Sequence, residues 1–399
     1  MSSKNESKSD EALSPGEDQS KAQYLLGNVA AAEGALAAGC DFYAGYPITP
    51  SSEVMHHMAV KLRAAGGVFI QMEDEIASIA AIVGASWSGR RSMTATAGPG
   101  LSLMMEGIGY AAMTETPCVL VDIQRAGPCT GQATHVGSGD VLQVRFGSHG
   151  DYMPVALSPW SVQEMFDLTV RAFQLSEKLR VPTFLLADEA VGHLRESAVL
   201  KEHVPVEGRP RPKTPEQAKE PFGFSDEKDP DGGHGVPPMP FFGEGADLLV
   251  TGSTHDPGGY RKVDHPEIHH KLVRRLTNKV LAARDEVVEV EEYEIEDADV
   301  AVVAYGFTAR SALAAVRRLR REGVGAGLMR LKTLWPFPDE EIRSLGDRVR
   351  HILFPEMNLG QLAGVARQHS LCPVESLSQT NGKIINPETI YKAVQRSLP

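Results

Sequence analysis

Apolar residues follow two alternating patterns along this chain, one typical of amphipathic helices and one typical of buried strands. Val54, Met58 and Leu62 recur at four-residue spacing, as on one face of a helix. Between such segments lie short apolar runs, such as the VLVDI of residues 119–123, which are typical of strands covered on both faces. The pattern predicts strands over 40–47, 68–72, 90–97, 116–125 and 181–188. It predicts helices over 28–39, 51–67, 73–89, 101–115 and 158–180, with a turn at 98–100.

The same alternation resumes near the C-terminus. It predicts strands over 298–306, 324–331 and 350–358 and helices over 308–323, 338–347 and 359–369. Repeated alternation of strand and helix favours a parallel, doubly wound α/β domain. We therefore predict one such domain over residues 23–200 and a second, smaller α/β domain over residues 297–399.

The segment between the two domains, residues 201–296, has a different character. Nine of the chain's 26 prolines lie between Lys201 and Gly245, and this density discourages both helix and sheet. We predict a long extended connection that wraps over the first domain or over a partner, with a short strand at 246–252.

Residues 1–22 are polar and contain neither a secretory signal nor an Arg-rich transit peptide, so we predict a disordered tail. No apolar run approaches the 18 residues or so that a membrane span needs. A formal charge of −12 argues against non-specific binding of nucleic acid. These features predict a soluble, cytoplasmic protein.

The four cysteines form no CxxC pair and no iron–sulfur run. Cys40, Cys118 and Cys372 lie in or beside apolar segments, and we expect buried free thiols there rather than a disulfide framework.

Several helix ends carry residues that suit caps. We expect Asn28, Asp74 and either Ser51 or Ser52 at N-caps, and Gly39 just after a helix. The arginines of the helix predicted over 308–323 are expected to form a solvated face: Arg317, Arg318, Arg320 and Arg321.

Three polar stretches follow predicted strands of the first domain, at 45–52, 73–75 and 124–128. Ligands of open α/β sheets bind beyond the carboxyl ends of the strands, so these stretches are candidates for one site. Acids at a helix start, such as Glu75, complement the helix dipole. At a junction with a helix rich in small residues, however, a carboxyl group would be partly desolvated and able to share a proton.

Arg125 ends an apolar strand, where its guanidinium could bind a carboxylate through two hydrogen bonds or form a structural salt bridge. Thr49 lies between Pro47 and Pro50, which hold it in an extended turn. His149 is a further candidate for contacting a substrate.

Two glycine motifs argue against a phosphate site on this chain. Residues 96–102 (TAGPGLS) lack both GxGxxG and the P-loop pattern, which favours a tight turn. Residues 137–140 (GSGD) resemble a diphosphate–magnesium motif, but the paired asparagines expected downstream are absent. The histidines have no recognisable metal-binding spacing.

Several long motifs occur in an order that resembles one family. GYPITPSSE, QMEDEIASIAAIVGAS, ATAGPGLSLMMEGIGYA, DIQRAGPCTG, HGDYMPVALSPWSVQE and PEMNLGQL are similar to the α subunits of 2-oxoacid:ferredoxin oxidoreductases, most closely those acting on 2-oxoglutarate. The resemblance runs from about Gln23 to the C-terminus.

The resemblance implies an enzyme that uses thiamine diphosphate to oxidise a 2-oxoacid, passes the acyl group to coenzyme A and gives electrons to ferredoxin. It implies a domain that binds the aminopyrimidine ring followed by a transketolase C-terminal-like domain. The diphosphate, Mg²⁺ and a 4Fe–4S cluster would be bound by a β subunit, in an αβ complex that pairs into a higher oligomer. We expect this chain to be without the fused N-terminal γ-type domain of some relatives, which implies a separate γ subunit or none.

The resemblance also implies roles for individual residues. Glu75 matches the glutamate that bonds the ring nitrogen of the aminopyrimidine, and Tyr46 and Pro47 are expected beside the cofactor. Thr49 matches the residue near the substrate carbonyl, with Ile48 next to it, and Arg125 matches the arginine near the substrate carboxylate.

Two alternatives remain. One is a branched-chain 2-oxoacid or pyruvate enzyme, and the other is a non-catalytic scaffold subunit. Intact Thr49, Glu75 and Arg125 speak against the scaffold.

Overall fold

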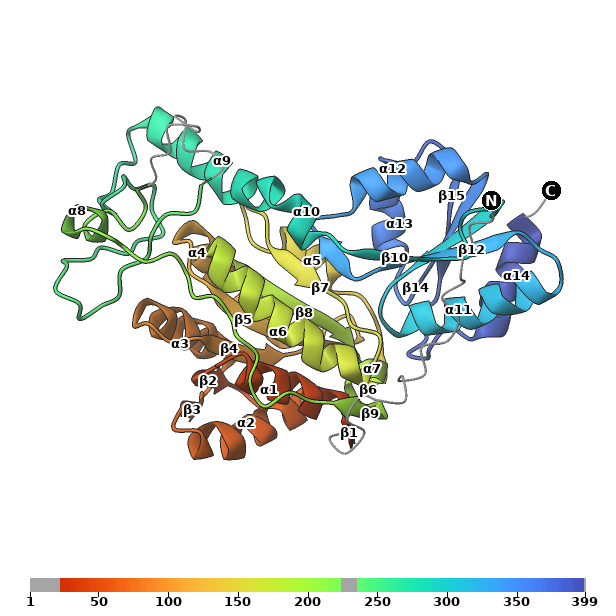
Figure 1. The fold of residues 1–399 in the computed structure, drawn as a ribbon, viewed down its shortest axis with the longest axis horizontal. Helices are drawn as coiled ribbons and strands as arrows, with labels where there is room; N and C mark the ends of the chain where they lie inside the picture. Colours follow the sequence, from red (N-terminus) through yellow and green to blue (C-terminus); the bar gives the residue numbers. More distant parts are fainter. Residues whose placement is uncertain (1–21, 224–234, 398–399) are drawn as a thin grey trace, which may run out of the picture.

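The computed structural model describes residues 22–223 and 235–397, which form two α/β domains and a long connection between them (Figure 1). The predicted tail, residues 1–22, lies outside the described residues except for Ala22. That residue opens β1 (Ala22–Leu26), which pairs antiparallel with β9 (Arg195–Val199).

The first domain is built on the larger sheet. Its strands are β2 (Phe42–Gly45), β3 (Val68–Gln71), β4 (Ser92–Thr96), β5 (Cys118–Ala126), β6 (Gln132–Val136), β7 (Val155–Leu157), β8 (Pro182–Asp188) and β13 (Thr333–Trp335). They run in the order β13-β7-β8-β5-β4-β2-β3, with β6 paired to the end of β5. From β7 to β3 the neighbours are parallel, which confirms the predicted doubly wound α/β class.

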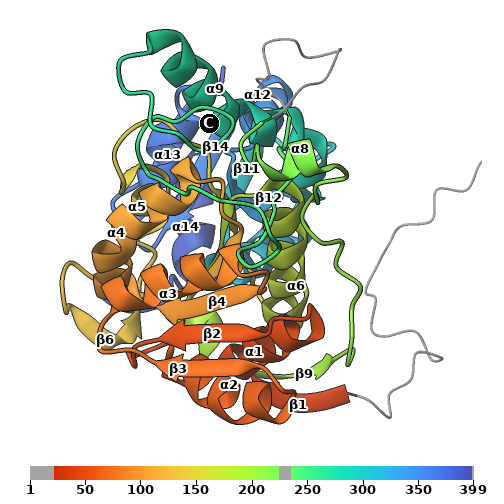
Figure 2. The ribbon, with the colours of Figure 1, turned by 90° about the vertical axis from the view of Figure 1, so that its left-hand side faces the viewer.

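Helices cover both faces of this sheet (Figure 2). They are α1 (Gly27–Ala37), α2 (Ser52–Ala64), α3 (Glu75–Trp87), α4 (Gly98–Met113), α5 (Val141–Phe146), α6 (Val162–Leu179) and α7 (Glu189–Gly192). Along β5, Cys118 and Leu120 pack with α3 and α4. Val119 and Val121 pack with α1, α2 and α6. The two-residue period of the strand therefore fills two cores, as the apolar run predicts.

The second domain has a smaller sheet in the order β10-β12-β11-β14-β15. Its strands are β10 (Val290–Tyr293), β11 (Val300–Ala304), β12 (Ala326–Leu331), β14 (His351–Glu356) and β15 (Val374–Ser378). Its helices are α11 (Gly306–Arg321), α12 (Asp339–Arg348), α13 (Gln361–Ala366) and α14 (Pro387–Ser397). β11, β12, β14 and β15 are parallel, and β10 joins antiparallel from the preceding segment.

The two domains share a strand. After β12 the chain crosses back, and β13 pairs antiparallel with β7 at the edge of the first domain's sheet. The backbone N–H of Ser158 donates to the carbonyl of Lys332 at 2.7 Å beside this pairing. The domains are therefore joined by a β-ladder as well as by the connection.

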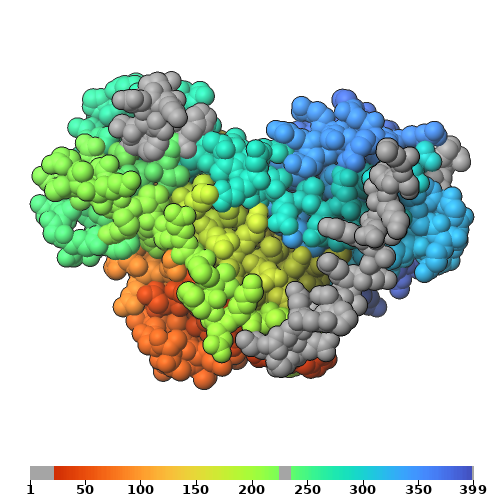
Figure 3. All heavy atoms as spheres, in the orientation of Figure 1, coloured from red at the N-terminus to blue at the C-terminus, as the bar shows by residue number. Residues whose placement is uncertain are grey.

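The connection contains the short helices α8 (Pro215–Ala218) and α10 (Arg284–Val287) and the longer α9 (Pro266–Ala282). In Figure 3 its green surface lies directly against the red and orange surface of the first domain. Arg180 fixes part of it, because its buried guanidinium donates to the carbonyls of Pro221, Pro237 and Pro238 at 2.8–3.1 Å. Arg209 also forms a buried ion pair with Glu177 of α6.

A buried charged cluster holds α9 to the first domain. Glu115 accepts hydrogen bonds from Arg275 Nη2 at 2.6 Å and Lys279 Nζ at 2.8 Å, and Arg180 Nε donates to its backbone carbonyl at 2.9 Å. Burial alone would raise the pKa of Glu115, but these three cations outweigh burial and hold the pKa far below its usual range.

Several local predictions are wrong. Asn28 is not an N-cap: α1 is capped at Leu26, and the Asn28 amide donates to Pro50 O at 2.7 Å and Glu53 Oε2 at 2.9 Å. Residues 98–100 form the first turn of α4 rather than a separate turn, because proline suits a position where no N–H bond is needed. Residues 246–252 form no strand.

Other local predictions are confirmed. Asp74 caps α3 by accepting from Ala77 N at 2.7 Å, and Gly39 has a positive φ of 81° just after α1. Cys40 and Cys118 are buried free thiols, whereas Cys372 is only half-buried, because it lies in the turn before β15. On α11, Arg317, Arg318 and Arg321 are exposed, and Arg318 pairs with Glu322 and Glu388. Arg320 departs from the predicted solvated face, because it is half-buried and pairs with Asp297.

Replacing Glu115 by alanine leaves buried cations without their counter-charge. We expect the free energy of unfolding to fall by about 3–5 kcal/mol, measured by urea denaturation at neutral pH. Because the pKa of Glu115 is lowered on folding, its contribution is present above the unfolded-state pKa and is lost only as the pH falls through the folded-state pKa. The exposed Glu207→Ala is the control, and an equally small effect of both changes would contradict the role of the cluster.

Candidate functional site

The candidate site lies where the carboxyl ends of β2 and β5 meet the first turns of α3 and α4. In a parallel sheet these ends share one edge, so the loops after them converge. The loop after β2, residues 46–51, forms one wall. Tyr46 is 39% exposed, Pro47 is exposed, and Ile48 and Thr49 are half-buried.

Hydrogen bonds from neighbouring elements fix this loop. Ser51 occupies the N-cap position of α2, but its hydroxyl donates back to Ile48 O at 2.9 Å instead of capping the helix. Asn28 of α1 donates to the carbonyl of Pro50. The loop is therefore held from both ends while Tyr46 and Pro47 face outward.

Arg125 binds the same loop from the end of β5. Its Nη1 donates to the backbone carbonyl of Thr49 at 2.7 Å, so the structure brings these two predicted residues together. The side chain is 8% exposed, and its Nε has no hydrogen-bond partner among the described residues. The printed hydrogen bond of the Arg125 guanidinium goes to a backbone carbonyl and not to a carboxylate, so the described part of the chain gives no support to a purely structural ion pair. A donor on a buried cation thus remains available to a ligand.

Glu75 is the first residue of α3 and is only 4% exposed. Its carboxylate lies between β4 and α4: a Cβ added to Gly100 would come within 2.4 Å of Glu75 Oε1 and 2.1 Å of Thr96 Oγ1. Burial raises the pKa of Glu75, its own backbone amide opposes the rise, and the neighbouring charge of Asp74 adds to it. No other described residue hydrogen-bonds the carboxylate.

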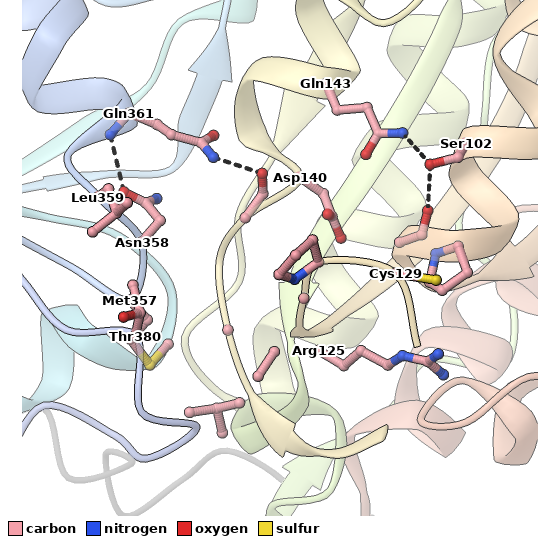
Figure 4. A pocket seen from close by; sticks show the side chains of 18 residues that line it. Ser102, Arg125, Cys129, Asp140, Gln143, Met357, Asn358, Leu359, Gln361 and Thr380 are labelled. Atoms are coloured by element: carbon pink, nitrogen blue, oxygen red, sulfur yellow. Dashed lines mark hydrogen bonds between the residues drawn. The ribbon is translucent and has the colours of Figure 1, made fainter. Parts of the chain in front are cut away.

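A pocket of about 420 Å³ opens between the two domains beside Arg125 (Figure 4). The first turn of α4, the end of β5 and the loop before α5 line it from the first domain. The segment Met357–Gln361 lines it from the second domain. Among the described residues that line it, the titratable side chains are Arg125, Cys129 and Asp140. Glu75 reaches this region through Gly100, two residues along α4 from the lining residue Gly98.

His149 is not brought to this site. It is exposed and lines a different hollow of about 320 Å³, together with Tyr110, Tyr152 and His269. The structure thus unites Thr49 with Arg125, sets Glu75 behind the same edge and leaves His149 apart.

The support that the second domain gives to the pocket is not apparent from the sequence pattern. Gln361 holds the loop before α5 from both sides, because its Oε1 accepts from Leu142 N at 3.0 Å and its Nε2 donates to Gly139 O at 2.7 Å. Glu356 accepts from the first amides of α13 and from Tyr305 Oη at 3.0 Å. The PEMNLGQL motif carried this information, but only as part of a resemblance.

No group of three or more His, Cys, Asp or Glu side chains within residues 22–223 and 235–397 is arranged to hold a metal ion.

No helix in the described part of the chain is long and apolar enough to cross a membrane.

Comparisons with known proteins identify the class. Residues 33–275 match the family of pyruvate flavodoxin/ferredoxin oxidoreductases in its thiamine-diphosphate-binding part, and residues 298–390 match core domain II of pyruvate:ferredoxin oxidoreductase. The chain belongs to this family of oxidoreductases. The resemblance drawn from the motifs is therefore confirmed.

Individual members of the family differ in how similar they are to this chain. The chain is 48% identical over 373 residues to 2-oxoglutarate synthase subunit KorA of Methanothermobacter thermautotrophicus, which covers 93% of this chain and 97% of the relative. It is 47% identical over 378 residues to the same subunit of Methanocaldococcus jannaschii, covering 94% and 99%. Identity to ketoisovalerate oxidoreductase subunit VorB of Methanothermobacter marburgensis is 36% over 374 residues, covering 94% and 97%.

Solved structures support the same fold. The 2-oxoglutarate:ferredoxin oxidoreductase of Magnetococcus marinus, with 2-oxoglutarate, coenzyme A and succinyl-CoA bound, matches with a TM-score of 0.88 at 32% identity. The match covers 94% of this chain and spans 65% of that one. A split-gene transketolase matches with a TM-score of 0.54 at 14% identity, covering 94% of this chain and 99% of that one, and supports the fold alone.

Gly100→Ala tests how closely α4 packs on Glu75. The added methyl would clash with Thr96 and Glu75, so we expect a loss of about 1–3 kcal/mol in the free energy of unfolding and a displaced Glu75 side chain in a crystal structure. Gly364→Ala on α13 is the matched control, since a Cβ there meets nothing within 4 Å. An undisplaced Glu75 with unchanged stability would contradict this packing.

Proposed function

We propose that this chain is the α subunit of a cytoplasmic 2-oxoglutarate synthase, active only with a β subunit. The complex converts 2-oxoglutarate, coenzyme A and oxidised ferredoxin to succinyl-CoA, CO₂ and reduced ferredoxin. The observation that carries the proposal is that one sheet edge holds a buried carboxyl group, which no other described residue hydrogen-bonds, and a buried guanidinium whose Nε has no partner among the described residues. The choice of 2-oxoglutarate follows the full-length relatives, which are 47–48% identical.

The residues fit thiamine diphosphate. A heterocycle that must accept and return a proton is matched by a carboxyl group whose pKa is raised and that takes no hydrogen bond from another described residue, and Glu75 is such a group. When bound, the cofactor supplies the nucleophilic carbon and takes up the electrons that decarboxylation leaves. Glu75 then holds a proton at its carboxylate toward the aminopyrimidine, and Tyr46 and Pro47 border the ring.

Arg125 and the loop after β2 bind the substrate in this proposal. The free Nε of Arg125 donates to the carboxylate of the 2-oxoacid, while Nη1 keeps its bond to Thr49 O and so fixes the direction of the guanidinium. Thr49 orients the carbonyl group of the acid, and Ile48 closes the site against water. His149 is left out because it lies in another hollow.

A β subunit covers the face beside Glu75. The outer faces of α3 and α4 form an apolar hollow of about 740 Å³, in which Ile76 is 55% exposed and Leu103 is 49% exposed. An apolar area of this kind is typical of a surface that a partner buries. The β subunit would bring the diphosphate site, Mg²⁺ and the 4Fe–4S cluster, and the αβ unit would pair again.

A second candidate is a ketoisovalerate oxidoreductase subunit. The 36% identity to VorB over 94% of the chain keeps this substrate open. Residues 23–200 would bind the aminopyrimidine ring with either substrate, and residues 297–399 would serve as the transketolase C-terminal-like domain.

A substrate panel on the copurified complex separates these candidates. We expect 2-oxoglutarate to give the highest kcat/KM in coenzyme A-dependent viologen reduction, ahead of pyruvate and 2-oxoisovalerate. Arg125→Lys keeps the charge but loses the planar fork, so we expect kcat/KM to fall about 10-fold or more for every acid of the panel. A higher kcat/KM with 2-oxoisovalerate than with 2-oxoglutarate would show that 2-oxoisovalerate is the substrate. Unchanged kinetics of the Arg125→Lys variant would show that Arg125 does not bind the substrate.

Glu75→Ala removes the proton-holding group while leaving the apolar contact face intact. We expect turnover to fall about 10²–10⁴-fold in a complex that still assembles, as judged by size-exclusion chromatography. Glu73→Ala, an exposed acid two residues earlier, should keep its turnover. Near wild-type turnover of the Glu75 variant would rule out the assigned role.

A further inference from the structure

One carboxyl group at the wall of the inter-domain pocket, Asp140, and a buried carboxyl group behind it, Asp122, have no role in the proposed reaction. Asp122 lies on β5, three residues before Arg125, and is fully buried. Asp140 lies at the start of α5 and lines the pocket. Both oxygens of Asp122 and Oδ2 of Asp140 lack a donor among the described residues. The two carboxyl groups are close enough for each to shift the pKa of the other.

Neighbouring groups pack closely around Asp140. Its backbone N–H donates to Gln124 Oε1 at 3.1 Å, and a Cβ added to Gly98 would lie 3.0 and 3.1 Å from its two carboxylate oxygens. The loop that carries it is held by Gln361 of the second domain. Asp140 is therefore fixed at the wall of the pocket, against the first turn of α4 (Figure 4).

Two buried carboxyl groups in contact cannot both be ionised, because like charges in a medium of low dielectric repel strongly. One proton between them removes the repulsion and supplies the missing donor. Burial and the charge of Asp140 raise the pKa of Asp122 well above its usual range. Burial also raises the pKa of Asp140, to about 6, against the opposing effects of the bond from Asp122 and of Arg125. At neutral pH Asp122 is therefore the donor and Asp140 carries the single negative charge.

Few charged groups of the described chain lie near Asp140. Asp122 and Arg125 face it from β5, and the uncharged first turn of α4 faces it through Gly98. The thiol of Cys129 lines the same pocket, and neutral Gln361 and Asn358 line it from the second domain. An anion bound at Arg125 therefore enters the field of one negative charge that a single proton can neutralise.

We propose that the pocket binds its carboxylate ligand together with one proton, which Asp140 of the Asp122–Asp140 pair takes up. The proposal rests on the proposed function in that the ligand is the carboxylate of a 2-oxoacid at Arg125. Asp140 is a positioning residue here: as an ionised group it repels the ligand carboxylate at Arg125, and as a neutral group it does not. Proton uptake and carboxylate binding then favour each other by linkage.

The sign of the pH dependence follows from Asp140. Below its pKa of about 6, Asp140 is already neutral, so binding takes up no proton from this group. Above that pH, Asp140 is ionised in the free protein and binding takes up a proton, so affinity falls as the pH rises, by at most about tenfold per pH unit.

The test uses the assembled complex and glutarate, a dicarboxylate without the reacting carbonyl. Isothermal titration calorimetry at about pH 7 to 8, in two buffers of different ionisation enthalpy, counts the protons taken up on binding while glutarate remains fully ionised. We expect about one proton per site for the wild type and none for Asp140→Asn, whose affinity should no longer change with pH. Asp122→Asn is the matched control: its amide still donates to Asp140, so uptake should persist.

The calorimetry tests the proposed proton uptake independently of whether the complex catalyses the proposed reaction. Equal uptake by wild type and Asp140→Asn, no uptake by the wild type, or no binding of glutarate would each overturn it. Asp140→Ser must reproduce the loss, which guards against an effect of misfolding in the asparagine variant. Failure of the proposed function would instead show as absent turnover with every 2-oxoacid, while proton uptake on glutarate binding is measured without turnover.

Discussion

Burial of β5 along its whole length is the constraint on which the site depends. The strand carries polar residues at its carboxyl half, and a buried polar group is costly unless a partner satisfies it. Arg125 is satisfied in part by Thr49 O from the loop after β2, and Asp122 has Asp140, at the end of the loop before α5, as the neighbour that raises its pKa. The buried polar side chains of this one strand thus contact two loops that are distant in the sequence, at the same sheet edge. The polar atoms that remain without a partner are available to a ligand.

The second domain completes this arrangement rather than adding a separate function. Gln361 and Glu356 hold the loop of Asp140 and the start of α13, and Tyr305 links the two through Ser138. The connection has a comparable role at the other end of the molecule, where Arg180, Arg209 and Glu115 fix it by buried hydrogen bonds and ion pairs. A segment rich in proline has few backbone hydrogen bonds of its own, so side-chain donors from the domain replace them.

The sequence predicts those features that depend on local patterns. The apolar period of β5 and α3, the cap at Asp74 and the left-handed Gly39 all follow from residues within one turn or strand. The meeting of Thr49 and Arg125 also follows, since parallel strands place their carboxyl ends together. Features that depend on contacts between distant segments were not predictable in this way. Asn28 looked like a cap but serves Pro50 and Glu53, and Asp140 looked like part of a failed diphosphate motif although its partner is on β5. The isolation of His149 also depends on tertiary packing, which no motif encodes.

The return of β13 to the first domain's sheet has a consequence for synthesis on the ribosome. The edge strand β7 (Val155–Leu157) is translated long before Thr333–Trp335, which pair with it, so the first domain emerges with an open sheet edge. At about 5–20 residues per second, that edge waits on the order of ten seconds or more for its partner. An unpaired edge attracts other strands, so the nascent chain needs protection of β7 during this interval.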